Sequence, residues 1–334
     1  MTTTRFHSWL VPVLGLLALA LLPGVLTPYT HDLVMKIAVY AVFALSLELL
    51  VGMTGLVSLG HAAFLGIGAY VTAILSTRYE VLSIAVLLPA AIGAATLYAL
   101  FVGALSLRTR GVYFIMVTLA FAQMAYFVFH DTQLGGGSDG MFIYTKPVLA
   151  VGEQTLVDLD DKRHLYVAVI AALAFTYGLL ALVRRSRFGH ALAGIRVNEQ
   201  RMRAAGYPTY LYKLGAFVMA GALAGLAGFL LAVKDGGVNP ELLSWHESGG
   251  VLLMIILGGI GHLRGAVLGA LALTLLKEFF QMEAWLGPLA SHWQMTFGFT
   301  VIVFVALLPQ GLIGLTALRR RRINSLRAST AHDR

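Results

Sequence analysis

The chain has 334 residues, of which 58% are hydrophobic and 12% charged, and its mean hydropathy is +0.81. A soluble domain carries about 25% charged residues, so this composition excludes an ordinary water-soluble fold. The formal charge of +8 does not indicate nucleic-acid binding, because Lys and Arg fall between apolar runs and at the C-terminus, as they do in the cytoplasmic flanks of membrane spans. The absence of cysteine excludes disulfides and thiolate metal sites.

Ten apolar segments predict an all-α, polytopic integral membrane protein with about ten transmembrane or half-membrane helices. The segments are residues 9–26, 33–52, 56–75, 81–107, 112–129, 165–183, 211–233, 249–260, 265–280 and 295–309. Arg5 and His7 before the first segment would also suit a signal peptide. That segment is long enough to span and lacks a small-x-small cleavage site, so we expect a retained span.

The charges between the segments predict the orientation. With Arg5 in the cytoplasm, alternation places the basic loop 184–213 and the basic tail 319–334 inside, and the acidic loop 131–164 in the periplasm. We therefore expect a transmembrane domain of residues 1–318, a cytoplasmic tail, and both termini in the cytoplasm. This orientation needs a turn near Gly261; one continuous tilted helix over 249–280 is the alternative.

Two stretches interrupted by glycine resemble each other, residues 59–66 (LGHAAFLG) and 260–269 (IGHLRGAVLG). Broken segments in both halves of a chain are typical of inverted-repeat transporters, whose solute pathway runs between the repeats. The pattern suggests an inverted repeat, and ordinary close packing of helices stays open as an explanation for the glycines. The candidate pathway residues are Ser58, Gly60, His61, Phe64, Thr118, Gly261 and His262.

Ionisable residues inside the predicted spans are few, and each costs several kcal/mol at the bilayer centre unless it faces protein or water. Glu48 lies near the inner end of its span and Lys277 and Glu278 near the outer end of theirs, which favours snorkelling or local pairing. His61 lies in a glycine-rich break and is the stronger pathway candidate. No carboxylate is clearly placed near mid-membrane, where an ion-coupled secondary carrier would need one.

Catalytic motifs are missing from the sequence. There is no Gly-x-x-x-x-Gly-Lys-Ser/Thr loop to hold nucleotide phosphates, no His-Glu-x-x-His and no Gly-x-Ser-x-Gly. An intramembrane enzyme would have to use Ser58 and His61 as nucleophile and base. We expect a protein that is not an enzyme and has neither a cofactor nor a metal site.

The loop of residues 184–213 contains an amphipathic pattern. Leu192, Ile195, Met202 and Ala205 fall roughly on one helical face, which predicts short helices lying across a partner. Gly206, followed by a proline, should end the last of these helices. A solvated basic linker is the alternative interpretation.

This loop resembles the coupling segment of permeases in the branched-chain amino-acid ABC transporter family, of the LivM type. The likeness also includes residues 52–64, 108–120, 135–140, 212–217, 224–228 and 308–312, and so covers most of the chain from about 35 to 315. In that family the segment contacts the ATP-hydrolysing subunit. The resemblance assigns this contact to Arg187, Gly189, Leu192, Ile195, Arg196, Glu199, Arg203 and Gly206.

The resemblance implies an importer in the bacterial inner membrane. Its other parts would be a second, LivH-type permease, two ATP-binding subunits and a periplasmic solute-binding protein, with no nucleic acid among the partners. Branched-chain amino acids are the first expectation for the solute. Urea or short amides are the alternative within the family, and an ion-coupled secondary carrier is the alternative outside it.

Overall fold

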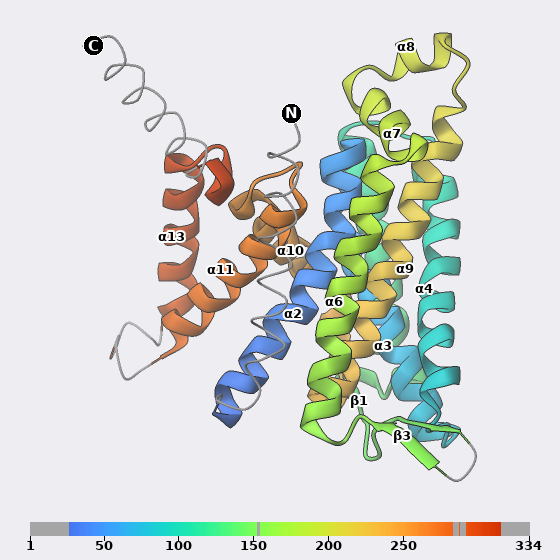
Figure 1. Cartoon of the computed structure of the whole chain (residues 1–334), viewed down its shortest axis with the longest axis vertical. Coiled ribbons are helices and arrows are strands. Elements are labelled where there is room, and N and C mark those ends of the chain that lie inside the picture. The colour runs from blue at the N-terminus through green and yellow to red at the C-terminus, as the bar shows by residue number, and fades with distance from the viewer. Residues whose placement is uncertain (1–26, 152–153, 283–286, 288–291, 315–334) are drawn as a thin grey trace, which may run out of the picture.

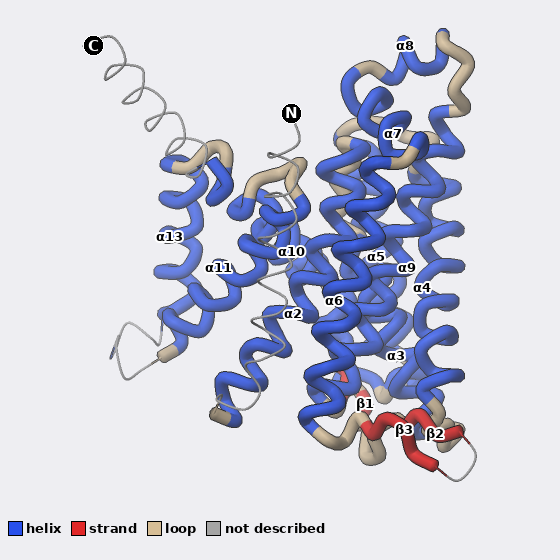
Figure 2. Tube along the Cα trace, in the orientation of Figure 1, coloured by secondary structure: helices blue, strands red, loops and turns tan. Residues whose placement is uncertain are grey.

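The computed structural model describes residues 27–151, 154–282, 287 and 292–314. Within these ranges the chain forms eleven α-helices and four short strands (Figures 1 and 2). The predicted first span, 9–26, and the basic tail, 319–334, lie outside the described residues. The strands are small, so the expected all-α membrane architecture is confirmed.

Six helical runs among the described residues are long and apolar enough to cross a membrane. They are α2 with the π-helix η2 (Pro28–Glu48 and Leu49–Thr54), α4 (Ile84–Ser106), α5 (Val112–Asp131), α6 (Lys162–Arg185), α9 (Thr209–Asp235) and the run that begins with α13 (Trp293–Leu307). Helix α3 (His61–Arg78), with 18 residues, packs between them.

The segment expected at 249–280 is broken. The chain bends by 115° between helix α10 (Trp245–Gly258) and helix α11 (Leu263–Gln281). Gly259 and Gly261 take φ of 113° and 89°, which side chains with a Cβ rarely adopt. The predicted turn near Gly261 is confirmed, and the alternative of one continuous helix is wrong.

A second break follows α2. The last turn of this run is π-helical, and Gly55 ends it with φ 76°. Residues 55–60 are irregular, and α3 begins only at His61. The single predicted span at 56–75 is therefore an irregular stretch followed by a helix that extends to Arg78.

The loops lie at two opposite ends of the bundle. At one end, β1 (Met141–Phe142) pairs with β4 (Gly237–Val238), and β2 (Val148–Val151) forms a hairpin with β3 (Gln154–Asp158). The short helices η3 (Gln133–Gly135), η4 (Gly137–Asp139) and η5 (Pro240–Leu243) accompany these strands. Figure 1 shows α7 (Arg187–Val197) and α8 (Glu199–Ala204) at the other end, as the predicted orientation requires. We call the strand end the outer end, after the orientation that the sequence predicts; which end faces the periplasm stays a prediction.

The two similar glycine–histidine stretches share a local construction, because each runs from a break into the first turns of a helix. Both helices run toward the outer end: Arg78 of α3 contacts the Gln133 carbonyl, and Glu278 of α11 contacts Lys36 near the start of α2 (Figure 1). Helices related by inversion would run in opposite directions. These stretches therefore do not supply the inverted relationship, which stays a prediction for the rest of the chain.

Candidate functional site

The predicted loop 184–213 is shorter in the structure, because its ends belong to α6 and α9, and between them lie the two short helices α7 and α8. The Ser186 hydroxyl caps α7 by accepting from the Gly189 N–H at 3.2 Å, and the Asn198 side chain caps α8 by accepting from the Arg201 N–H at 2.9 Å. Gly206, with φ 87°, follows α8, as the sequence predicted. The expected short helices are confirmed.

Three of the predicted coupling residues face the bundle. Leu192 and Ile195 are buried in the core, and Gly189 lies so close to the Val183 carbonyl of α6 that a side chain would collide with it. These residues hold α7 against the ends of the long helices. A partner subunit would not reach them in this conformation.

Glu199 and Arg203 belong to a polar cluster that connects α8 to α9. Oε1 of Glu199 accepts from Arg203 Nη2 at 2.6 Å, from Lys213 Nζ at 3.0 Å and from the Thr209 hydroxyl at 3.0 Å. Burial pushes the pKa of the Glu199 carboxyl upward, but hydrogen bonds and positive charge from these neighbours hold that pKa below its usual range. Lys213 and Thr209 were not among the predicted site residues.

The surface of α7 and α8 that is open to a partner includes the predicted Arg187, Arg196 and Arg203, and it also includes side chains that were not predicted. Arg187 is exposed, and so is Val197, with 84% of its surface accessible at the turn between the helices. Tyr207 is also exposed. Helical periodicity could not identify Val197, because a single apolar residue forms no repeat. Its position next to Asn198, the residue that caps α8, could have identified it as part of an exposed turn.

Arg196 connects this loop to both helix breaks. Its guanidinium donates to the Gly52 carbonyl in the π-helix η2. The same side chain lies beside Gly55, which ends η2, and beside Gly261 in the α10–α11 turn. A residue predicted to touch a partner therefore contacts the interior of its own chain.

Glu48 completes this contact. Its side chain is 1% exposed, and Oε1 accepts from the Gly261 N–H at 2.7 Å. The carboxylate lies over Gly52, where a Cβ would collide with it. The sequence predicted that Glu48 would either snorkel or pair locally. In the structure it pairs, and its partner is the backbone N–H of Gly261. We call Glu48, Gly52, Arg196 and Gly261 the inner junction.

The pathway candidates near the first break are buried. His61 has no exposed surface; its Nε2 lies 2.8 Å from the Ser46 hydroxyl, and its ring stacks on Phe43. The Ser58 hydroxyl accepts from the Gly60 N–H, and His61 has Ser46 as its hydrogen-bond partner, so no hydrogen bond joins Ser58 to His61 in the described part of the chain.

The remaining candidates fall into two separate places. Gly60 packs against the Thr118 backbone, and Phe64 contacts Phe217 of α9 in the core. Gly261 belongs to the inner junction, and His262 is exposed at the start of α11. The structure does not bring the candidates together into one lining, and their role in a pathway stays a prediction.

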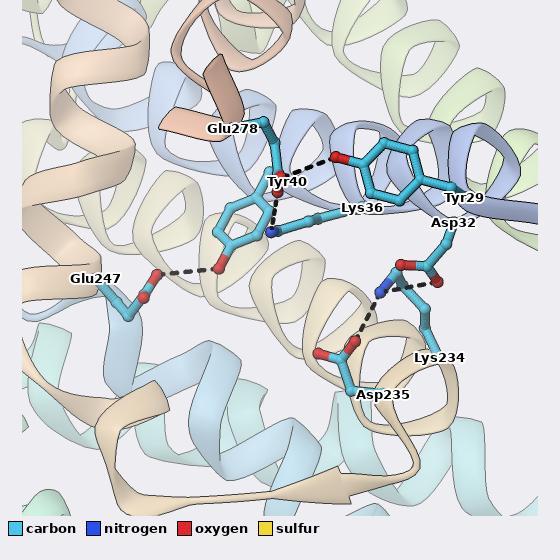
Figure 3. Close-up of polar contacts among 8 residues, drawn as sticks. All are labelled: Tyr29, Asp32, Lys36, Tyr40, Lys234, Asp235, Glu247 and Glu278. Atoms are coloured by element: carbon cyan, nitrogen blue, oxygen red, sulfur yellow. Dashed lines mark hydrogen bonds and ion pairs between the residues drawn. The ribbon is translucent and has the colours of Figure 1, made fainter. Parts of the chain in front are cut away.

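Glu247 is a site residue that the sequence pattern missed. It lies in the first turn of α10, and Tyr40 donates to its Oε2 at 3.3 Å (Figure 3). Tyr40 is twelve residues after Pro28 and fourteen before Thr54, the ends of a 27-residue span. A carboxylate therefore lies near mid-membrane, where none was expected. Hydropathy assigned Glu247 to a loop, whereas α10 begins two residues before it.

The outer half of α2 makes further polar contacts (Figure 3). Lys36 pairs with Glu278 of α11 at 2.8 Å, and Tyr29 donates to the same carboxylate at 3.2 Å. Asp32 pairs with Lys234 of α9 at 3.3 Å. The local pairing expected for Glu278 is confirmed, and α2 is connected to α9, α10 and α11 by side chains.

The described residues include no group of three or more His, Asp or Glu side chains able to hold a metal ion. A bundle of long apolar helices with two glycine breaks, one of them next to short amphipathic helices, defines a polytopic membrane protein of the permease class. Residues 29–306 match the family described as branched-chain amino acid transport system / permease component. The chain belongs to this family of ABC transporter permeases, whose members are non-catalytic transmembrane subunits, and the recognition made from the sequence is confirmed.

Three curated relatives illustrate the range of the similarity. The high-affinity branched-chain amino acid transport system permease protein LivM of Escherichia coli K12 is 29% identical over 91% of this chain and 75% of its own length. LivH of Salmonella typhimurium is 24% identical over 82% of this chain and 91% of its own. The xylose transport system permease protein XylH of E. coli K12 is 26% identical over 37% of this chain and 33% of its own. No solved structure matches.

Proposed function

We propose that the chain is the LivM-type permease of an importer in the bacterial inner membrane and that it translocates branched-chain amino acids. A periplasmic binding protein delivers the solute, a LivH-type permease supplies the other half of the pathway, and two ATP-binding subunits hydrolyse ATP. The matched family and the similarity to LivM over most of both chains support this assignment.

The observation that carries the proposal is the contact of Arg196 with the first break. Helix α7 presents Arg187 and Val197 outward, while Arg196 of the same helix holds the Gly52 carbonyl and lies beside Gly261. An ATP-binding subunit that moves α7 would therefore displace both helix breaks together. Packed interfaces move between discrete arrangements, so a small shift at α7 is sufficient to switch access.

The orientation follows from the same assignment. The ATP-binding subunits work in the cytoplasm, so α7 and α8 lie there, and the loop 131–164 faces the periplasm. Both termini are cytoplasmic in this arrangement, and the binding protein docks on the outer end.

The solute is the part of the proposal that the family fixes least, because one fold serves unrelated solutes. LivM supports a branched-chain amino acid, whereas XylH carries a name for a sugar. Urea is the alternative solute, and unlike an amino acid it has neither a charged ammonium nor a charged carboxylate group.

The test is uptake of labelled leucine and, separately, of urea by proteoliposomes that contain the chain with its permease, ATP-binding and solute-binding partners. We expect leucine uptake that stops when ATP or the binding protein is left out. Uptake of urea alone would move the solute to the alternative. Leucine uptake by this chain alone under an ion gradient would contradict the proposal in favour of a secondary carrier.

A further inference from the structure

Glu247 is an ionisable residue at a depth where charge is costly. Helix α10 has 14 residues and rises only about 21 Å, less than the roughly 30 Å of hydrocarbon, so it begins inside the membrane region. Glu247 lies in its first turn, level with Tyr40 near the middle of the α2 span. An ionisable residue at this depth indicates function by default.

The chain itself only partly neutralises Glu247. Among the described residues, Tyr40 is its one hydrogen-bond donor, and a phenol carries no charge. Lys36 lies one turn before Tyr40 on α2, but its ammonium is held by Glu278 at 2.8 Å. Glu247 thus lacks the cation that a buried carboxylate normally has as a partner.

Lys277 carries the complementary charge. Lys277 and Glu247 interact electrostatically, yet no ion pair within 4.0 Å joins them in the described part of the chain. The Lys277 ammonium lies over the Trp293 ring, 5.7 Å from its centroid. The residue next to it, Glu278, contacts Lys36, four residues before Tyr40, which is about 6 Å along the axis of α2. Lys277 and Glu247 therefore lie near each other without forming a direct ion pair.

There is room beside Glu247. Gly250 lies one turn after Glu247 on the same face of α10, and apart from its chain neighbours and the backbone of its own helix no described atom lies within 4 Å of the position that a Cβ would occupy there. By contrast, four glycines at or near the α10–α11 turn pack tightly against backbone atoms: Gly258, Gly259, Gly265 and Gly269. The open position at Gly250 and the Glu247 side chain therefore share one face of α10.

We propose that Glu247 and Lys277 bind the charged groups of a zwitterionic α-amino acid on its way through the membrane. The solute ammonium is bound by the Glu247 carboxylate with the Tyr40 oxygen beside it, and the solute carboxylate is bound by the Lys277 ammonium. Each solute charge then meets a charged partner, which gives the strong class of hydrogen bond. This inference rests on the proposed function and names the solute class, because neutral urea would gain nothing from either charge.

The absence of cysteine in the chain allows a direct test. Gly250→Cys places a thiol one turn after Glu247 on the same face of α10, in open space, in the assembled transporter in proteoliposomes. The rate of its labelling by a methanethiosulfonate reagent is measured with leucine and with 4-methylpentanoate, which is leucine without its ammonium group. We expect leucine to slow the labelling and 4-methylpentanoate to have little effect.

Glu247→Gln in the same background should raise the leucine concentration for half-protection about tenfold or more, since one charged partner of a hydrogen bond is lost. Lys277→Met should do the same. The matched control is Glu80→Gln, an exposed carboxylate after the end of α3, which should leave the protection unchanged. Leucine-stimulated ATP hydrolysis reports that each variant is assembled.

Equal protection by leucine in the Glu247→Gln and unsubstituted backgrounds would overturn the site, and so would equal protection by leucine and 4-methylpentanoate. Leucine uptake without any protection of the introduced thiol would also overturn it. Failure of leucine uptake by the unsubstituted transporter has a different meaning: it removes the proposed function, and the zwitterion site with it.

Discussion

The inner junction and the outer contacts of α2 use charge in different ways. At the inner junction, the charged groups of Glu48 and Arg196 bind backbone groups, the Gly261 N–H and the Gly52 carbonyl, at places where helices are broken. In the outer half, charged side chains mostly bind other side chains between helices, as Lys36 does with Glu278.

This difference teaches what each region is able to do. A contact with backbone at a break changes only when the chain path changes, so the inner junction suits the transmission of movement. A contact between side chains can be exchanged for a contact with a solute while the helices stay in place. The outer half therefore suits binding.

The largest effect is expected from Arg196→Ala. Losing a hydrogen bond to a charged group costs about 1.5–3 kcal/mol, so uptake should fall roughly tenfold or more while ATP hydrolysis continues. The measurement is the ratio of leucine transported to ATP hydrolysed. Arg201→Ala, which removes an exposed arginine from the neighbouring helix, should leave the ratio unchanged. An unchanged ratio in Arg196→Ala would remove the distinction between the two regions.

A second substitution examines the packing of the inner junction. Gly52→Ala places a methyl group where the Glu48 carboxylate lies, so it should destabilise the protein by about 1–3 kcal/mol. Thermal unfolding in detergent measures this change. Gly93→Ala in α4 is the control, because nothing lies within 4 Å of its Cβ and the helix should gain slightly. Equal melting temperatures for Gly52→Ala and the unsubstituted protein would contradict the close contact.

The smallest effect is expected at the outer ion pair. Lys36 and Glu278 are 32% and 21% exposed, and partly solvated pairs contribute about 0–1 kcal/mol. A double-mutant cycle with Lys36→Met and Glu278→Gln, read by thermal unfolding, should give a coupling energy in that range. A coupling of several kcal/mol would show that the outer contacts hold the helices as firmly as the inner junction does.

Much of the fold follows from local pattern. Apolar length located the long helices, and charge alternation located a turn near Gly261, where the structure shows Gly259 and Gly261 in backbone conformations that glycine takes without strain. The amphipathic pattern of the loop predicted short helices, and the structure adds the capping side chains of Ser186 and Asn198 at the starts of α7 and α8. These features depend on residues within one or two turns of each other.

The site was less accessible. Arg196 was selected for a partner contact, but its hydrogen bond to Gly52 joins residues 144 positions apart. Glu247 was passed over because the residues around it are polar, although a tyrosine 207 positions away fixes its depth. No periodicity in the sequence records contacts of this kind.

The sequence by itself determined that this protein spans the membrane many times, which loops are basic and acidic, and to which family it belongs, because hydropathy, charge and motif are properties of short segments. Only the tertiary structure decided that Glu48 and Arg196 meet two helix breaks and that Glu247 lies near mid-membrane. The physical reason is that burial and charge pairing depend on which distant segments pack together, and that choice is made by the whole chain.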